Sequence, residues 1–479
     1  MLFNSWTFPA FFALVWLAYR QLQHRAQNVL LVVASYVFYG WWDWRFLSLL
    51  AISTVVDFTC GRWVYEASDP KIRLRYLRVS LLTNLGILGF FKYFNFFVGS
   101  VASGLAALGL EANTPVLQVV LPVGISFYTF QTMAYTIDIY RGREQPTQSM
   151  LDFALYVAYF PQLVAGPIER STHLLPQIIA PRFVTATQLT SGLELILMGF
   201  AKKVLIADSV APYVNEVFAD PTGMGKAELA LGVYLFALQI YGDFAGYTDI
   251  ARGISRLFGI ELGLNFRQPY VSSNITEFWR RWHISLSSWL RDYLYIPLGG
   301  NRHGELMTYR NNFLTMVLGG LWHGASWNFV VWGALHGGYL AVHKLSLGKQ
   351  RVGLTPFPDG VASWGRLLVK GAVTFHLVCL AWIFFRADTL ADSWAFLVGL
   401  ASGPFATTGL GDVAKMALVL GFFGGLTLLM DLGCWKRDAE VPVPQDWPWW
   451  VRGSLYGTLV GLLLLLGESD AQPFIYFQF

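Results

Sequence analysis

The sequence predicts an all-α polytopic membrane protein, and three observations support this fold class. Only 13% of the 479 residues are charged, whereas roughly a quarter are charged in soluble domains. Hydrophobic residues make up 55% of the chain, and its mean hydropathy is +0.46. Apolar runs close to the length of a bilayer span recur from end to end. Together these features exclude a soluble enzyme, a disulfide-stapled secreted domain and a nucleic-acid-binding protein.

The apolar runs predict the individual membrane helices. The first run carries no positive charge before Arg20, so it does not resemble a cleavable signal peptide and is expected to stay in the membrane. We expect one membrane domain over residues 1–467 and a tail over 468–479. The predicted spans are 6–22, 28–42, 45–65, 79–98, 116–139, 150–166, 190–212, 228–248, 312–343 (in one piece or two), 366–386, 414–432 and 450–467.

Three basic clusters predict the orientation of the chain in the membrane. They are Arg20–Arg25, Lys71–Arg78, and Lys436–Arg437 together with Arg452. Lys and Arg gather in cytoplasmic loops, so each cluster is expected in the cytoplasm. The N-terminus and the tail after the span 450–467 are then expected on the extracytoplasmic side.

The middle of the chain, residues 252–310, differs from an ordinary span because arginines alternate there with tryptophans. Two interpretations stay open. The segment forms amphipathic helices in the membrane interface or dipping into the protein, or it is a belt of snorkelling side chains without chemistry. The residues concerned are Arg252, Arg256, Arg267, Arg280, Arg281, Arg291, Arg302, Arg310, Trp279, Trp282 and Trp289.

His323 is the first candidate for chemistry, because it stands in an apolar stretch next to Gly319, Gly320 and Gly324. Polar residues inside membrane segments cost free energy and are usually functional or paired. A neutral imidazole can take a proton near pH 7, and small neighbours let a substrate or another helix approach. The alternative is a structural histidine that is hydrogen-bonded to a neighbouring helix, with Asn328 nearby.

His283 and the segment Tyr241–Asp249 are further polar candidates. His283 follows Glu277 and Arg281, which pair at i,i+4 if the segment is helical, and an interfacial helix with internally paired groups is the simpler interpretation. Within Tyr241–Asp249, the group Tyr241, Asp243, Tyr247 and Asp249 either lines a polar cavity or pins one helix to the bundle. We favour pinning. The 3 cysteines lie far apart, so neither a metal site nor a disulfide framework is expected.

Several segments together resemble the membrane-bound O-acyltransferase (MBOAT) family. The similar branch is the bacterial one that acylates cell-envelope polysaccharides, typified by the membrane subunit of alginate O-acetyltransferase. The resemblance covers essentially the whole chain. It is carried by VAGPIER at 164–170, YGDFAGYTD at 241–249, NFRQPY at 265–270, EFWRRWHISLSSWLRDYLYIPLGG at 277–300, NRH at 301–303 and LWHGASWN at 321–328.

The resemblance implies a ring of roughly 11–13 transmembrane, re-entrant and interfacial helices around a transmembrane tunnel, in the bacterial inner membrane. It also implies acetyl-CoA as a cytoplasmic acyl donor and no bound cofactor. The family's two histidines fall on His323 and His283. Substrate contacts are expected from Trp322 and Asn328, and the CoA phosphates are assigned by charge alone to Arg280, Arg281, Arg291 and Arg302.

The tail carries a second resemblance. FIYFQF at 474–479 is similar to the C-terminal motif of the small partner peptide of teichoic-acid D-alanylation, whose tyrosine carries the acyl group outward. The matching position here is Tyr476. Our hypothesis is that His323 activates Tyr476 and that His283 stabilises the oxyanion or positions CoA. The resemblance also implies an extracytoplasmic esterase-like transferase that acylates a polysaccharide such as alginate.

Other functions stay open from the sequence. Within the family, the acyl group could be D-alanyl or another acyl group, and the acceptor could be teichoic acid, peptidoglycan or cellulose. Outside it, a transporter or flippase for a lipid-linked sugar would use the buried His and Asp as a proton relay. A scaffold that only recruits the external transferase is the third alternative.

Overall fold

The computed structural model describes residues 1–110, 117, 120–347, 352–466 and 474–475. Within these ranges the chain is built from helices and loops, and it contains no β-strand. The predicted all-α class is therefore confirmed. The ring of helices, the tunnel and the single membrane domain stay predictions.

The chain forms two compact units. Unit 1 consists of Met1–Leu193 and Ala251–Gly263, and unit 2 consists of Glu194–Ile250 and Leu264–Phe479. Two long helices, α10 (Ala186–Phe200) and α12 (Lys226–Leu257), contribute residues to both units. Each unit is described by itself below.

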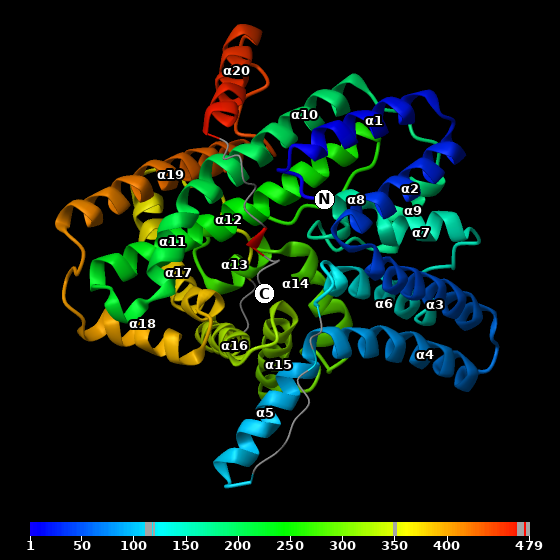
Figure 1. Cartoon of the computed structure of the whole chain (residues 1–479), viewed down its shortest axis with the longest axis horizontal. Helices are drawn as coiled ribbons and strands as arrows, with labels where there is room; N and C mark the ends of the chain where they lie inside the picture. Colours follow the sequence, from blue (N-terminus) through cyan, green and yellow to red (C-terminus); the bar gives the residue numbers. More distant parts are fainter. Residues whose placement is uncertain (111–116, 118–119, 348–351, 467–473, 476–479) are drawn as a thin grey trace. The chain divides into compact units, whose positions relative to one another are not determined.

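Unit 1 packs its helices around buried polar side chains as well as apolar ones. Asp57 of α3 is fully buried and accepts hydrogen bonds from Asn84 of α4 (2.6 Å) and Thr136 of α6 (3.0 Å), which ties these three helices together. In Figure 1 the elements of this unit before α10 run from blue to teal. Its elements before α10 are α1 (Thr7–Gln21), α2 (His24–Asp43), η1 (Trp44–Phe46), α3 (Leu47–Glu66), α4 (Pro70–Leu88), η2 (Gly89–Tyr93), α5 (Phe94–Ala107), α6 (Ile125–Tyr140), α7 (Met150–Ala158), α8 (Phe160–Leu163) and α9 (Ser171–Ile179).

Unit 2 holds the residues that the sequence singles out for chemistry. Short helices occupy its middle part, and long helices follow them (Figure 1). Besides its share of α10 and α12, it comprises η3 (Ala201–Asp208), α11 (Ser209–Ala219), η4 (Pro221–Gly223), η5 (Pro269–Val271), α13 (Ile275–Arg281), α14 (Ile284–Leu290), η6 (Arg291–Tyr295), α15 (Gly304–His323), α16 (Trp327–Leu347), α17 (Val361–Arg386), α18 (Leu390–Ser402), α19 (Leu410–Arg437) and α20 (Trp449–Leu466).

Several helices are long and apolar enough to cross a membrane, which confirms the predicted multi-pass class. They are the stretches His24–Glu66, Pro70–Ala107, Lys226–Leu257, Val361–Arg386 and Leu410–Arg437. The predicted run 150–166 is instead broken into α7 and the short α8, with Pro161 at the start of α8. The run 312–343 forms two helices, α15 and α16, because the chain leaves the helix at Gly324.

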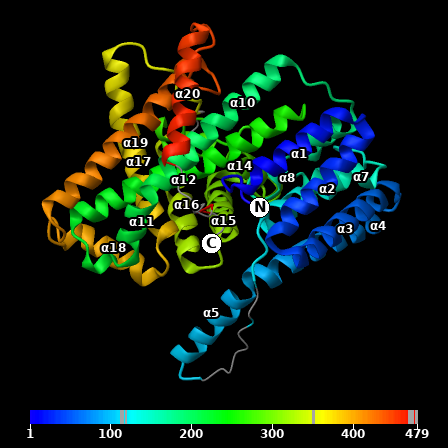
Figure 2. The ribbon, with the colours of Figure 1, turned by 45° about the horizontal axis from the view of Figure 1, so that its top comes forward.

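The helices α15 and α16 pack unusually closely, and Figures 1 and 2 both show them side by side. A Cβ atom added to Gly320 of α15 would overlap the carbonyl oxygen of Phe329, and one added to Gly333 of α16 would overlap that of Met316. Glycine at these positions lets the two backbones touch, as small residues do between membrane helices. This contact fixes the end of α15, where His323 lies.

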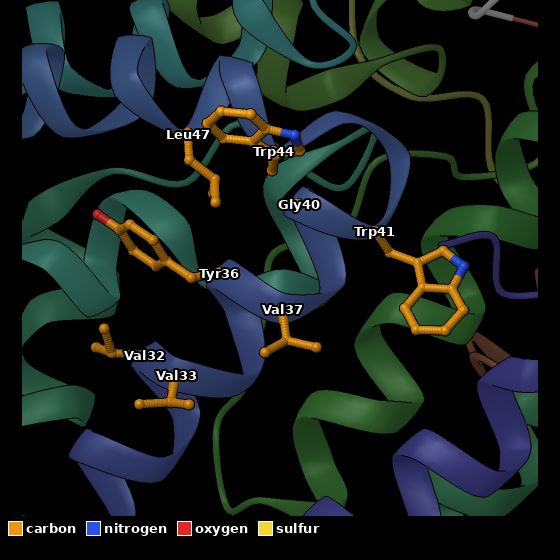
Figure 3. A pocket seen from close by; sticks show the side chains of 8 residues that line it. All are labelled: Val32, Val33, Tyr36, Val37, Gly40, Trp41, Trp44 and Leu47. Atoms are coloured by element: carbon orange, nitrogen blue, oxygen red, sulfur yellow. The ribbon is translucent and has the colours of Figure 1, made fainter.

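An apolar groove lies on unit 1. Its volume is about 600 Å³, and Trp41 and Trp44 stand largely exposed at its edge (Figure 3). The groove contains none of the predicted catalytic or substrate-binding residues. Its lining consists of Val32, Val33, Tyr36, Val37, Gly40, Trp41, Trp44 and Leu47.

We expect the substitution Gly333→Ala to destabilise the protein by about 1–3 kcal/mol, because the added methyl group collides with backbone rather than with a movable side chain. Gly338→Ala on the same helix is the control, since nothing lies within 4 Å of a Cβ atom there and alanine favours a helix over glycine. Thermal unfolding in detergent, followed by tryptophan fluorescence, measures both. Equal melting temperatures for the two variants would contradict the close contact.

Candidate functional site

His283 lies between α13 and α14 with its side chain fully buried. Its backbone is left-handed (φ 43°, ψ 54°), a conformation that residues other than glycine rarely adopt. The neighbouring segment holds this geometry, because Ile284 donates its N–H to the carbonyl oxygen of Asn265 at 2.9 Å. Backbone strain of this kind persists where the surrounding structure enforces it, which is common in functional sites.

The side chain of Asn265 fixes the protonation pattern of the His283 ring. Its Oδ1 atom accepts the N–H of Ser285 (3.2 Å) and the Ser285 hydroxyl (2.9 Å), so the atom facing these donors is the oxygen. His283 Nδ1 lies 3.2 Å from the same oxygen and therefore carries the proton. Nε2 is left with the lone pair and acts as the acceptor.

Burial also affects the charge of His283. The residue lies outside the helices that are long enough to cross a membrane. Removal from solvent lowers the pKa of its imidazole to about 3, because a low-dielectric environment disfavours the charged form. The ring is therefore neutral at physiological pH.

His323 is the last residue of α15, and only 4% of its surface is exposed. Its ring centroid lies 5.0 Å from that of Trp332 on α16 and 5.3 Å from that of Phe385 on α17. The centroids of the His323 and His283 rings are 6.2 Å apart. The structure thus brings together the two histidines that the sequence places 40 positions apart.

The predicted substrate-binding residues Trp322 and Asn328 lie in different surroundings. The Trp322 ring is buried with its centroid 5.8 Å from that of His283. Asn328 is also buried, and its amide donates to the carbonyl oxygen of Ala387 at 2.6 Å. That hydrogen bond anchors the start of α16 to the end of α17. A direct role for Asn328 in substrate binding stays a prediction.

The four predicted phosphate-binding arginines do not share one environment. Arg281 is buried and pairs with Glu277 at 2.9 Å, so its charge is neutralised within the protein. Arg280 is exposed and donates to the carbonyl oxygen of Val352. Arg291 and Arg302 are also exposed, and Arg291 pairs with the neighbouring Asp292. Binding of CoA phosphates by these residues stays a prediction.

The described part of the tail is buried beside His283, which the sequence did not predict. Phe474 and Ile475 are 2% and 1% exposed. The Phe474 ring centroid lies 5.6 Å from that of Phe244, and Phe244 in turn lies 4.7 Å from His283. One aromatic ring therefore separates the tail from the buried histidine. Tyr476, the predicted acyl carrier, lies outside the described residues.

The polar residues of α12 pin this helix, as the sequence predicted for Tyr241–Asp249. Tyr241 donates its hydroxyl to Asp431 of α19 at 2.9 Å. Asp243 and Asp249 pair with Lys203 (2.6 Å) and Lys202 (2.7 Å) of η3. Neither lysine is among the sequence candidates, because each stands beside an apolar run without a motif. Among the residues that the structure describes, no group of His, Cys, Asp or Glu is arranged to hold a metal ion.

Known proteins resemble this chain over much or all of its length. Residues 144–384 match the family model of the membrane-bound O-acyltransferases. A probable alginate O-acetylase AlgI of Pseudomonas putida is 39% identical over 100% of both chains. A protein of that name from Pseudomonas fluorescens is 43% identical, again over 100% of both. A peptidoglycan O-acetyltransferase of Helicobacter pylori is 36% identical over 84% of this chain and 80% of its own. With its helical fold and paired buried histidines, this chain belongs to the membrane-bound O-acyltransferase family.

Proposed function

We propose that this protein takes an acetyl group from cytoplasmic acetyl-CoA and passes it, through Tyr476, toward the O-acetylation of an extracytoplasmic polysaccharide. Family membership and the names of its relatives support acetyl transfer to a glycan. The observation that carries the proposal is the burial of Phe474 and Ile475 one ring away from His283. We call the buried position of Phe474 and Ile475 the dock. Tyr476, which carries a phenol side chain, is the next residue in the sequence.

The relay removes the need to move CoA through the membrane. The charged phosphates of CoA cannot enter hydrocarbon at low cost, whereas an acetyl group on a tyrosine can be carried on a neutral side chain. We assign the CoA phosphates to the exposed Arg280, Arg291 and Arg302, which lie outside the helices that are long enough to cross a membrane.

In the proposed chemical step, His323 removes the phenol proton of Tyr476 while the phenolate oxygen attacks the thioester carbonyl. A phenol has a pKa of about 10, so a histidine can activate it more readily than an alkyl hydroxyl. The tetrahedral intermediate then collapses. Its carbon–sulfur bond breaks, the CoA thiolate leaves and takes the proton from His323, and Tyr476 holds the acetyl group as an aryl ester.

His283 has a positioning role in this proposal. Because its Nδ1 proton is directed to Asn265, its Nε2 atom can accept a hydrogen bond but cannot donate one to an oxyanion. The tautomer thus favours one of the two roles that the sequence left open. We assign His283 to holding the donor, through an amide N–H of the pantetheine arm of CoA.

The aryl ester is reactive enough for onward transfer. We propose that an esterase-like transferase on the extracytoplasmic side collects the acetyl group and delivers it to the polysaccharide. Alginate is the acceptor that the names of two full-length relatives indicate. The proposal places the protein in the bacterial inner membrane, with the tail on the extracytoplasmic side.

Incubation of the purified protein with labelled acetyl-CoA, without acceptor, is expected to place the label on Tyr476. His323→Gln should abolish this label, because glutamine fills similar space but cannot take the proton. Peptide mapping by mass spectrometry measures both. His343→Gln on α16 is the control, since His343 lies outside the site and contacts Thr276. A label on another residue, or one that survives in His323→Gln, would contradict the assigned roles.

In cells, Tyr476→Phe is expected to remove polysaccharide acetylation, because phenylalanine keeps the ring but has no hydroxyl to carry the ester. The acetyl content of the isolated polymer is the measurement, at protein levels matched to the wild type by immunoblotting. Unchanged acetylation would refute the tyrosine relay.

The substitution Asn265→Ala is expected to slow acetyl transfer, since the His283 tautomer is no longer fixed. Loss of a tautomer-setting partner costs about 10⁴-fold in a serine protease, where the histidine itself transfers the proton, so a smaller loss is expected for a positioning histidine. Asn265→Asp keeps the acceptor but adds a negative charge, which raises the pKa of His283. His283 Nε2 then becomes protonated as the pH falls through this raised pKa, so transfer by this variant should decline at a higher pH than in the wild type. An identical pH profile for Asn265→Asp and the wild type would argue against the role of His283.

A further inference from the structure

We propose that Asp243 is the positioning residue that anchors the tail and sets the register in which Tyr476 enters the site. The inference rests on the proposed function for its consequence, because the register matters only if Tyr476 carries the acyl group. The contact itself stands on the geometry alone.

The anchor is a hydrogen bond from the tail backbone to a buried carboxylate. The N–H of Ile475 donates to Oδ2 of Asp243 at 2.6 Å. The other carboxylate oxygen, Oδ1, pairs with Nζ of Lys203 at 2.6 Å. Asp243, Lys203 and Ile475 are 2%, 6% and 1% exposed, so water competes little for these bonds.

The charges around Asp243 explain why a tail N–H is favourable there. Lys203 also pairs with Asp208 at 2.8 Å, so two carboxylates share one ammonium group. A buried carboxylate needs further donors to offset its lost hydration, and a backbone N–H to an ionised oxygen is among the stronger hydrogen bonds. The tail therefore adds a backbone donor to a polar cluster of α12 and η3.

Residues of α12 contact both the backbone and a side chain of the tail. Tyr247 lies one helical turn after Asp243, and its ring centroid is 5.0 Å from that of Phe474. The Phe244 ring lies between the rings of Phe474 and His283. Asp243 thus holds the peptide while Tyr247 and Phe244 hold the ring that precedes it.

The hydrogen bond between Ile475 and Asp243 determines which residue of the tail follows the dock. Tyr476 follows Ile475 directly in the sequence. A slip by one residue would place Ile475 or Phe477, neither of which has a hydroxyl group, where the tyrosine belongs. The hydrogen bond between Asp243 and Ile475 is not needed to hold α12 against η3, because the Lys202–Asp249 pair already joins these two elements at 2.7 Å.

The test compares Asp243→Ala and Asp243→Asn with Asp249→Asn in the full-length purified protein. Hydrogen exchange of the Ile475 amide, resolved by fragmentation mass spectrometry, reports the anchor without any need for activity. The rate of Tyr476 loading at a series of acetyl-CoA concentrations gives its maximal value, called kcat here, and the half-saturating concentration, called KM. We expect at least tenfold faster exchange in Asp243→Ala and about a tenfold lower kcat, with KM for acetyl-CoA within twofold of the wild type. Asp249→Asn keeps an acceptor for Lys202 and should leave the exchange rate of the Ile475 amide at its wild-type value.

A second variant, Ile475→Pro, tests the anchor even if Asp243→Ala does not fold. Ile475→Pro removes the donor N–H and leaves the Lys203–Asp243 pair intact, so it should lower kcat as Asp243→Ala does. Unchanged Ile475 exchange in Asp243→Ala, or a wild-type kcat in Ile475→Pro, would overturn the anchor. If the wild type itself carries no acetyl on Tyr476, the relay is wrong, and the exchange data alone decide whether Asp243 holds the tail.

Discussion

The packing of Phe244 between His283 and Phe474 is the contact on which the site depends. Its ring lies 4.7 Å from one and 5.6 Å from the other, measured between centroids. A single side chain of α12 therefore sets the separation between the buried histidine and the docked tail. The rigidity of α12 matters for the same reason. The ion pairs of Asp243 and Asp249 with η3, and the hydrogen bond of Tyr241 to α19, hold this helix in place.

A second constraint is the need to satisfy polar groups inside an apolar protein. An unpaired buried polar group costs about 1–3 kcal/mol, and the site uses this requirement to orient its residues. The Oδ1 atom of Asn265 accepts hydrogen bonds from both the Ser285 backbone and the His283 ring. The same oxygen thus stabilises the turn after His283 and selects the tautomer of its ring.

The sequence predicts the helices well because their pattern is local. Most predicted spans fall on described helices, such as 6–22 on α1, 228–248 on α12 and 366–386 on α17, whereas 79–98 and 190–212 each cover three shorter elements. The interruption at Gly324 belongs to the run that the sequence left as one piece or two. The histidine pair is different. Each histidine stands out as a polar residue in its own segment, but nothing in the spacing of His283 and His323 brings their rings together, and only the family resemblance assigned both to one site. Motif similarity carried that part of the site, whereas hydropathy could not.

The contacts that complete the site could not be predicted from local pattern. Asn265 stands in a loop, and its role follows only from the left-handed backbone at His283. Lys203 and Asp243 meet because η3 packs against α12. Arg281 resembled a phosphate ligand by charge, yet its guanidinium is buried against Glu277. In each case the tertiary partner, rather than the residue type, determines what the side chain does.

The bond between Ile475 and Asp243 also bears on when the site forms during folding. It joins residues 232 positions apart, and contacts of such large sequence separation form late, since the chain between them must first be ordered. The helices from α13 to α20 lie within that interval. During biosynthesis, α12 and the histidines can be in place while the tail is still absent. The nascent protein therefore holds the assembled face of α12 before Phe474 and Ile475 can pack against it.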